Sequence, residues 1–322
     1  MTSRYARQML LPQIGTQGQA RLRSARVLLV GAGGLGCPVI QYLAGAGIGR
    51  ITIVDPDHVE ESNLHRQVLY TMADLGRAKA ECAASWVARS NPEITASAEV
   101  MRLEPANVAV LAEGVDLVID AADSFAATYI LSDHCQKSGQ PLISASVLGQ
   151  SGYCGGFCGG APSYRAVFPD LPAQAAACST AGVLGSAVGL MGTLQAQMAL
   201  ACLLGSGESP LGRIVTMDLE KLSFGGFSFL GAAEPDRGQF PFLSAGDIVK
   251  TDRVIELRPP SETAALPHPN AWRIAPEALP EALPQGAGRI VLCCRSGLRA
   301  WQAAQHLQAQ GHCNLALWAV GP

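Results

Sequence analysis

Apolar and polar positions alternate in short blocks through the first two-thirds of the chain. Apolar runs predict five buried strands, at residues 26–30, 50–54, 96–103, 115–120 and 141–146. Helical patterns lie between or after them, at residues 36–46, 78–90, 105–113 and 125–137. Short apolar strands that alternate with helices are typical of a mostly parallel sheet with helices on both faces. The pattern therefore predicts an α/β fold.

A glycine-rich stretch over residues 147–180 then interrupts this alternation. It contains Cys154 and Cys158, which we interpret as incidental thiols in a strand or turn. A long helix is expected at about 180–204, followed by strands at 212–218 and 224–230 that can pair. The apolar run 181–204 has the length of a membrane span, but glycines and polar residues interrupt it. We expect a buried helix of a soluble enzyme and no membrane partner.

The composition changes again after Ala232, where proline-rich and polar segments begin. We predict a first domain over residues 1–230, a linker over 231–243 and a small second domain over 244–322. Within the second domain, apolar runs at 254–258 and 288–294 predict strands, and residues 300–310 predict a helix. A chain of 322 residues is long enough for two domains with their own cores.

Charge and cysteine usage narrow the possible functions. The chain has 23 basic and 26 acidic residues, a net charge of −3, which argues against a general nucleic-acid-binding surface. Ten cysteines are scattered without a disulfide framework, as in proteins of a reducing compartment. The first residues lack the apolar segment of a signal peptide, so we expect a cytoplasmic protein.

A glycine turn between the first strand and the first helix is the main candidate for ligand binding. Gly31, Gly33, Gly34 and Gly36 follow the first strand, and Asp55 ends the second strand. Glycines allow a phosphate to approach the backbone, and an acid at this position usually holds a ribose hydroxyl. The arrangement predicts a Rossmann-like nucleotide site, which suits either a nicotinamide dehydrogenase or an enzyme that uses ATP.

Polar and cationic residues after Asp55 favour ATP. Four of them lie within 25 residues of it, namely Asn63, Arg66, Gln67 and Lys79. Cleavage of a phosphate bond needs fixed cations near its developing charge. Asp123, after the fourth strand, is a candidate Mg²⁺ ligand. A dehydrogenase is the weakest alternative, because no acid–base pair for hydride transfer is evident.

Several motifs together resemble the MoeB and ThiF adenylyltransferases, bacterial relatives of ubiquitin-activating enzymes that activate sulfur-carrier proteins. Besides the residues above, the matching segments are Arg4-Tyr-Ala-Arg-Gln8, Ser62–Gln67, Ala122-Asp-Ser124, Cys178–Val183 and Met191–Gln195. The resemblance implies that Asp55 binds the ribose of ATP and that Asn63, Arg66 and Lys79 bind its phosphates. It also implies Mg²⁺ at Asp123, and a homodimer in which Arg7 reaches into the neighbouring subunit's site.

The chain departs from this family in two respects. The family usually has Thr-Asp-Asn at residues 122–124 and an arginine at Thr128. Its members also often carry two Cys-x-x-Cys pairs that bind zinc. The first pair would fall at residues 163–166 and the second near 232–237, where this chain has no cysteine. Structural zinc needs about four nitrogen or sulfur ligands, so we expect none.

Two cysteines are candidates for sulfur chemistry. Cys178 lies just before the long helix, where a thiol tends to have a lowered pKa. By resemblance it attacks the acyl-adenylate or joins a persulfide linkage; the alternative is a structural thiol. Cys294 ends an apolar strand and is followed by Arg295, Ser296, Gly297 and Arg299. This loop resembles the active-site loop of rhodanese sulfurtransferases, which implies that Cys294 carries a persulfide, with a docking module as the alternative.

The expected function is ATP-dependent adenylation of a small ubiquitin-like sulfur-carrier protein that ends in Gly-Gly. Sulfur transfer to a thiocarboxylate follows, from a donor such as a cysteine desulfurase or thiosulfate. Two rivals remain: a scaffold that binds the carrier without catalysis, and an activator that forms a thioester through Cys178.

Overall fold

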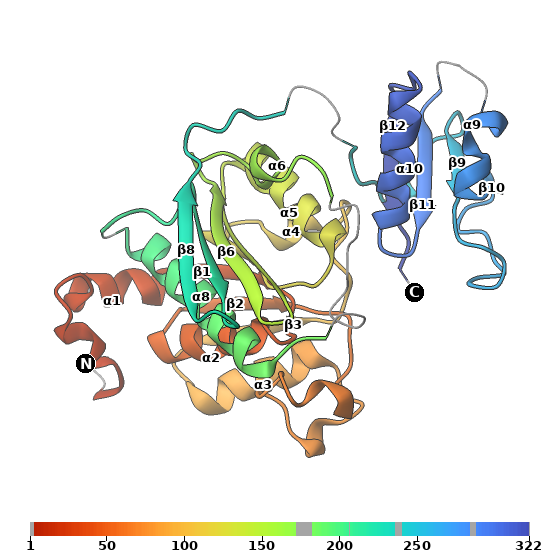
Figure 1. The fold of residues 1–322 in the computed structure, drawn as a ribbon. Helices are drawn as coiled ribbons and strands as arrows, with labels where there is room; N and C mark the ends of the chain where they lie inside the picture. The colour runs from red at the N-terminus through yellow and green to blue at the C-terminus, as the bar shows by residue number, and fades with distance from the viewer. Residues whose placement is uncertain (1–2, 172–181, 206, 236–239, 284–287, 322) are drawn as a thin grey trace.

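The structure is a computed structural model that describes residues 3–171, 182–205, 207–235, 240–283 and 288–321. It contains two β-sheets (Figure 1). The larger sheet has eight strands in the order β3-β2-β1-β4-β5-β6-β7-β8. Their bounds are Arg26–Val30 (β1), Arg50–Val54 (β2), Thr95–Glu99 (β3), Leu117–Asp120 (β4), Pro141–Leu148 (β5), Ser151–Cys158 (β6), Arg213–Asp218 (β7) and Ser223–Ser228 (β8).

Helices lie on both faces of this sheet, as the alternation of apolar and polar blocks predicts. They are α1 (Gly15–Ser24), α2 (Gly36–Ala46), α3 (Lys79–Ser90), α4 (Val108–Leu111), α5 (Phe125–Ser138), α6 (Tyr164–Val167) and α8 (Gly185–Leu204). Side chains along a strand point alternately to opposite faces. Leu29 of β1 therefore joins the buried cluster formed with α2, α3 and α8, whereas Leu28 joins the cluster formed with α5. The predicted Rossmann-like α/β fold is confirmed.

The sheet is parallel from β3 to β5 and antiparallel from β5 to β8. The change of direction occurs at a tight hairpin, because only Gly149 and Gln150 separate β5 from β6. Two-residue connections join antiparallel strands. A side chain at Gly156 would meet the carbonyl oxygen of Pro210 at 2.5 Å, so this glycine permits close packing. The glycine-rich stretch thus includes a full strand, on which Cys154 and Cys158 are buried free thiols.

Helix α8 packs in the core of this part of the molecule. It contacts α2, β5 and β6, and Gln195 donates hydrogen bonds to the carbonyl oxygens of Asp120 (2.6 Å) and Ile143 (3.3 Å). By length and composition alone the helix could cross a membrane, but half of its apolar stretch is buried within the protein. We expected it to begin near residue 180, but it begins at Gly185, directly after Leu184 in an extended conformation.

Strand β3 and helix α4 are shorter than predicted. The strand ends at Glu99 and the helix spans Val108–Leu111, whereas the apolar pattern predicted 96–103 and 105–113. The residues between them form a turn held by Asn107, whose Oδ1 accepts from the Glu104 backbone N–H (2.9 Å). The Asn107 amide also donates to the carbonyl oxygen of Arg102 (2.8 Å). Asparagine favours such local hydrogen bonds over a regular strand or helix.

The smaller sheet has four parallel strands in the order β10-β9-β11-β12. Its elements are β9 (Arg253–Glu256), β10 (Ala271–Arg273), α9 (Leu279–Ala282), β11 (Ile290–Cys294), α10 (Leu298–Ala309) and β12 (Leu315–Ala319). The domain boundaries remain our proposal. Within the segment interpreted as a linker, Phe240 and Phe242 are buried rather than exposed.

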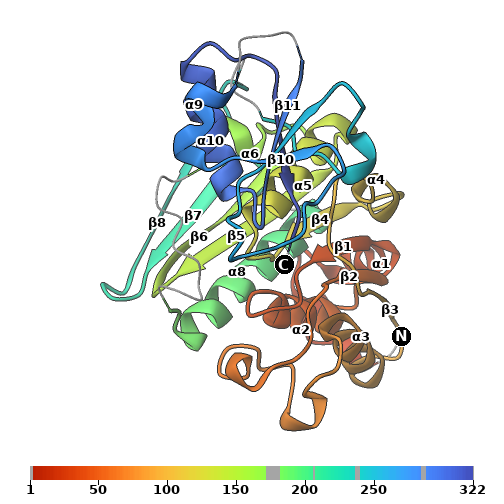
Figure 2. The same ribbon diagram turned by 90° about the vertical axis from the view of Figure 1, so that its right-hand side faces the viewer.

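The two sheet regions are joined by a shared buried cluster, in which α10 lies beside α5 and α6 (Figure 2). The Trp301 ring of α10 lies 5.0 Å from the Tyr129 ring of α5. The Arg165 guanidinium lies over both rings, 4.7 Å from the centroid of Tyr129 and 5.5 Å from that of Trp301. The same arginine makes a two-point ion pair with Asp133 at 2.6 and 2.9 Å. The ion pair holds Arg165 in place within the larger region, and the contacts of Tyr129 and Arg165 with Trp301 join the smaller region to it.

Candidate functional site

The predicted glycine turn joins β1 to α2 at the carboxyl edge of the larger sheet. Gly31 has a φ of +98°, and a side chain there would meet the Ala121 carbonyl oxygen at 2.5 Å. A side chain at Gly36 would strike the carbonyl oxygen of Gly31. These two positions require glycine, because the turn is packed closely against the end of β4.

The space beside the next glycine is more open. Among the described residues other than its chain neighbours, the only atom within 4 Å of a side chain built at Gly33 is Gln67 Nε2, at 3.7 Å. Gln67 is buried, its Nε2 donates to Asn63 Oδ1 (3.0 Å), and its Oε1 has no hydrogen-bond partner among the described residues. A buried polar atom without a partner is costly unless a ligand or water pairs with it. The turn and Gln67 thus fit a nucleotide, whose hydroxyl or amino groups donate hydrogen bonds.

Asp55 stands at the end of β2, beside this turn. Its Oδ2 accepts from the Ala32 backbone N–H (2.7 Å), and its Oδ1 accepts from the Asp57 N–H (2.8 Å). Burial raises the pKa of Asp55, while these hydrogen bonds oppose the increase. Tyr70, a residue that the sequence did not single out, donates its hydroxyl to the Ala32 carbonyl oxygen (2.7 Å). Asp55 and Tyr70 therefore hold the glycine turn from two sides.

The predicted cations lie on the segment that follows β2. Lys79 is buried and its Nζ pairs with Asp57 Oδ2 at 3.0 Å. Arg66 lies against Gly34 and donates to the Ser62 carbonyl oxygen (3.4 Å). Among the described residues Arg66 forms no ion pair with an acid, so its charge remains available to an anionic ligand.

Two acids stand at the end of β4 and in the loop after it. Asp123, the predicted Mg²⁺ ligand, is exposed. Asp120, which we did not predict, is fully buried; its Oδ2 accepts from Thr128 (2.7 Å) and Ser144 (2.8 Å). Burial raises the pKa of Asp120 to about 6, and these hydroxyl hydrogen bonds oppose the increase. Thr128, where the family usually has arginine, therefore supports the base of the Asp123 loop. Asp120 ends an apolar strand as Asp55 does, and that signal was available in the sequence.

We expect Asp120 to make the stability of the fold depend on pH. Its pKa rises from an ordinary value of 3.8 in the unfolded chain to about 6 in the folded chain. The stabilisation linked to its bound proton is complete below about pH 4 and is lost as pH rises through about 6, a loss of about 3 kcal/mol. Urea denaturation of the wild type and of Asp120→Asn, at acid and neutral pH, gives the free energy of unfolding of each protein. The loss is measured as the change with pH in the difference between these two free energies.

Glu113→Gln, which alters an exposed carboxylate between α4 and β4, is the matched control for that series. The free energies of unfolding of the wild type and of Asp120→Asn could instead differ by a constant amount from about pH 4 to 7. That result would show that Asp120 does not titrate in this range.

The remaining predicted features are Arg7, Cys178 and the zinc pairs. Arg7 is exposed near the start of the chain. Cys178 falls outside the described residues. Where the family's zinc pairs would lie, the Ser163 N–H and hydroxyl donate to the Glu234 carboxylate at 2.7 and 2.5 Å. The described residues contain no group of three or more His, Cys, Asp or Glu placed to hold a metal ion. Ser163 and Glu234 thus connect the two segments by hydrogen bonds.

The Cys294 loop joins β11 to α10 in the smaller sheet. Cys294 Sγ accepts hydrogen bonds from the backbone N–H groups of Gly297 (3.2 Å) and Ala300 (3.4 Å). Gly297 has a φ of +88°, which turns the backbone toward the sulfur. Arg295 and Ser296 are exposed, and Arg299 pairs with Glu262 at 2.7 Å. The predicted loop residues are therefore together, although Cys294 itself is only 1% exposed.

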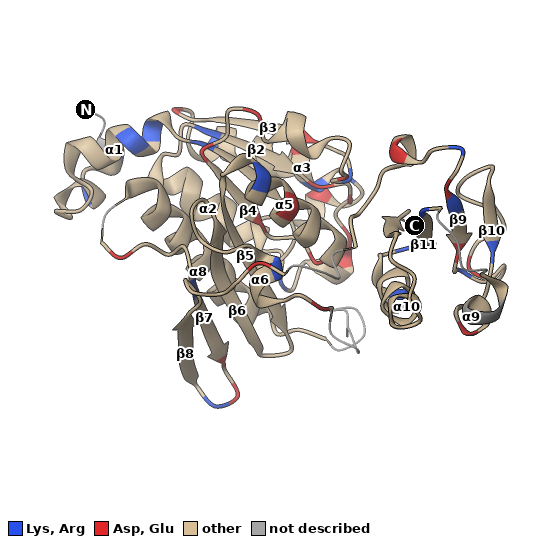
Figure 3. Cartoon of the chain, turned by 90° about the horizontal axis from the view of Figure 1, so that it is seen from above, with Lys and Arg blue, Asp and Glu red and all other residues tan. Residues whose placement is uncertain are grey.

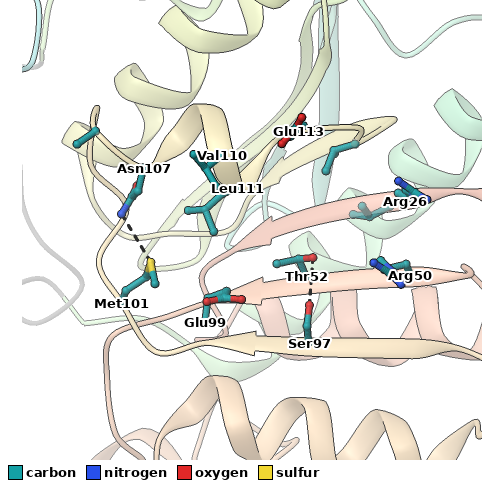
Figure 4. A pocket seen from close by; sticks show the side chains of 13 residues that line it. Arg26, Arg50, Thr52, Ser97, Glu99, Met101, Asn107, Val110, Leu111 and Glu113 are labelled. Atoms are coloured by element: carbon teal, nitrogen blue, oxygen red, sulfur yellow. Dashed lines mark hydrogen bonds between the residues drawn. The ribbon is translucent and has the colours of Figure 1, made fainter.

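A separate pocket of about 450 Å³, lined by charged and apolar residues together, lies on the sheet face beside α4 (Figure 4). Arg26 and Arg50 lie along one side, and Thr52 points toward Ser97, from which it accepts a hydrogen bond (3.2 Å). None of the predicted nucleotide-binding residues lines this pocket. Basic and acidic residues are intermingled along the described chain (Figure 3).

Comparison with known proteins places this geometry in context. The model of the ThiF family matches residues 5–237. The SAMP-activating enzyme E1 of Haloferax volcanii is 40% identical over 223 residues, covering 69% of this chain and 83% of that protein. The sulfur carrier protein adenylyltransferase of Thermus thermophilus is 42% identical over 229 residues, covering 69% and 84%.

Longer relatives match in part. The adenylyltransferase and sulfurtransferase UBA4 of Yarrowia lipolytica is 48% identical over 205 residues, which cover 63% of this chain and 52% of that protein. The chain therefore matches about half the length of such relatives. Among solved structures, E. coli MccB with MccA has a TM-score of 0.62 at 22% identity, covering 70% of this chain and 71% of that one. This likeness concerns the fold alone.

Proposed function

Because this chain belongs to the ThiF family and is an adenylyltransferase, we propose that it adenylates the C-terminal glycine of a small ubiquitin-like sulfur-carrier protein. One observation carries the proposal: the glycine turn at the carboxyl edge of the sheet lies beside a buried acid, Asp55, and beside Arg66, which has no acidic partner among the described residues. Ligands of such folds bind at this edge. The name of the Thermus thermophilus relative supports the choice of substrate.

The nucleotide would be held by residues from three segments. Asp55 accepts from the ribose, and Gln67 Oε1 gains a donor that the described protein does not supply. Asn63, Arg66 and Lys79 lie on the segment and helix after β2, where they would contact the phosphates. The N-terminal end of α2, which follows the glycine turn, would present the positive end of its helix dipole to the phosphates.

In the reaction, a carboxylate oxygen of the carrier's last glycine attacks the α-phosphorus of ATP. A new P–O bond forms, the bond to the bridging oxygen breaks, and pyrophosphate leaves with its electron pair. Arg66 and Lys79 stabilise the charge that develops on the phosphate oxygens. The product is a mixed anhydride between the carrier and AMP.

A magnesium ion fits the loop after β4. Asp123 is an exposed carboxylate without a described partner, and Mg²⁺ usually takes one or two carboxylates in addition to phosphate oxygens. When bound, the ion neutralises phosphate charge. Asp120 keeps the base of this loop in place through Thr128 and Ser144.

Sulfur transfer is the second half of the proposal. A persulfide on Cys294 would attack the acyl carbon with its terminal sulfur and displace AMP. A second thiol, for which Cys178 is our candidate, then breaks the S–S bond at Cys294 and releases the thiocarboxylate. The resulting cysteine disulfide needs a thiol reductant. The N–H groups of Gly297 and Ala300 support this rhodanese-like role, because they stabilise a sulfur anion.

We further propose a cytoplasmic homodimer in which Arg7 contributes to the neighbouring active site. ATP–pyrophosphate exchange with purified carriers that end in Gly-Gly tests the central step. We expect exchange that depends on the carrier and is lost when its last glycine is deleted. Absence of exchange by the folded enzyme with every such carrier would falsify the proposal.

A further inference from the structure

Arg102 belongs to the larger sheet region, but its side chain packs against the segment beside the cysteine loop of the smaller region. It lies in the turn after β3, where its carbonyl oxygen accepts from the Asn107 amide (2.8 Å). The same turn is tied to the second region, because the Ala106 N–H donates to Ser244 Oγ (2.9 Å). The backbone that carries Arg102 is therefore fixed relative to both regions.

The guanidinium group packs on the backbone that adjoins the cysteine loop. A side chain at Gly321 would overlap Arg102 Nη1, and the φ of +82° at this residue also favours glycine. The Gly321 N–H donates to the Arg295 carbonyl oxygen (3.0 Å), and the Val320 N–H donates to that of Cys294 (3.0 Å). Arg102 thus contacts a segment that is hydrogen-bonded to the loop itself.

Arg102 differs from the neighbouring arginines in having no acidic partner among the described residues. Arg258 makes a two-point ion pair with Glu256, and Arg299 pairs with Glu262. Within the described residues Arg102 has no ion pair, and its Nη1 is buried without a hydrogen-bond partner. Burial lowers the pKa of Arg102, and negative charge at Glu104 or Cys294 opposes that change. Arg102 as a whole is partly buried, and a partly buried cation without an ionic partner is costly unless an anion accompanies it.

We propose that Arg102 is a positioning residue for the sulfur anion at Cys294, supplied by the larger sheet to a loop of the smaller one. This inference rests on the persulfide role proposed for Cys294. The guanidinium stabilises the thiolate before loading and the persulfide anion after it. With thiosulfate, the Cys294 thiolate bonds to the outer sulfur, the S–S bond of thiosulfate breaks, and sulfite leaves with the electron pair. Sulfur loading then depends on the docking of the two regions.

Alkylation of Cys294 by iodoacetamide as a function of pH, followed by peptide mass spectrometry, tests this role. The variants are Arg102→Gln, which removes the charge, and Arg102→Lys, which keeps it. Arg89→Gln, at an exposed arginine of α3, is the control. We expect Arg102→Gln to slow alkylation at neutral pH about tenfold and to move its pH profile upward, with most of the rate restored in Arg102→Lys. Pyrophosphate exchange and melting temperature should stay at wild-type values.

Two results would overturn the inference. One is an Arg102→Gln profile within about twofold of the wild type. The other is equal slowing in the glutamine and lysine variants together with a lower melting temperature, which indicates a structural role. Loading with thiosulfate separates this inference from the proposed function. If the wild type takes up no sulfur but Arg102→Gln still slows alkylation, the charge role stands and the persulfide role fails.

Discussion

Replacing Arg66 with alanine should lower the rate of ATP–pyrophosphate exchange by about 100- to 1000-fold. Arg66 lies against the glycine turn and has no acidic partner among the described residues, so its charge is free for the phosphates. A fixed cation contributes most where charge develops in the transition state. Arg66→Lys, which keeps the charge but loses the planar geometry, should fall between the alanine variant and the wild type. Initial rates at saturating ATP and carrier measure the effect.

The matched control for this experiment is Arg77→Ala. Arg77 lies on the same segment but forms an exposed ion pair with Asp74 at 3.0 Å. Exposed pairs contribute about 1 kcal/mol or less, and this one is not at the glycine turn, so exchange should stay within about twofold of the wild type. If Arg66→Ala and Arg77→Ala behave alike, Arg66 does not act on the phosphates.

Replacing Cys294 with serine should abolish thiocarboxylate formation and leave carrier adenylation intact. The serine hydroxyl can still accept from Gly297 and Ala300, so the loop keeps its shape, but oxygen cannot carry sulfane sulfur. We expect the thiocarboxylate yield to fall at least about 100-fold, to background, because the step loses its nucleophile. Mass spectrometry of the carrier measures the product, and pyrophosphate exchange measures the first step.

Cys313→Ala serves as the control, since it removes an exposed thiol outside the loop. Cys293 is less suitable, because it is buried in the sheet, where burial raises the pKa of its thiol. Thiocarboxylate formed at the wild-type rate by Cys294→Ser would assign sulfur transfer to another thiol, or to a partner protein.

The parts of the fold that were predictable are those determined by local patterns. The apolar run at residues 26–30 and the glycines after it predict β1, the turn and α2. The glycines are a reliable signal, because the packing around Gly31 and Gly36 excludes a side chain. The position of Asp55 was predictable in the same way, because it is the acidic residue that follows the next apolar strand. The strand that ends at Cys294 and the helix after it were also predictable, since Gly297 marks the turn between them.

The rest depends on contacts between distant residues, which a local pattern cannot reveal. The length of α4 depends on the hydrogen bonds of the Asn107 side chain to the backbone of Arg102 and Glu104. The pattern of apolar residues does not reveal these bonds. Asp120 is recognisable as important only when Thr128 and Ser144 are seen to converge on it. Arg102 resembles an ordinary surface arginine in the sequence, and only the packing of Gly321 shows where it points.

The contact of Trp301 with Tyr129 and Arg165 has a consequence for how the chain folds and can be cut. The Tyr129 ring belongs to the larger region and the Trp301 ring to the smaller one. Neither region could therefore bury its ring without the other. Cleavage within residues 231–243 would expose these rings to water and favour aggregation. The chain should therefore melt in one cooperative transition, and the smaller region should be poorly behaved as a separately expressed module.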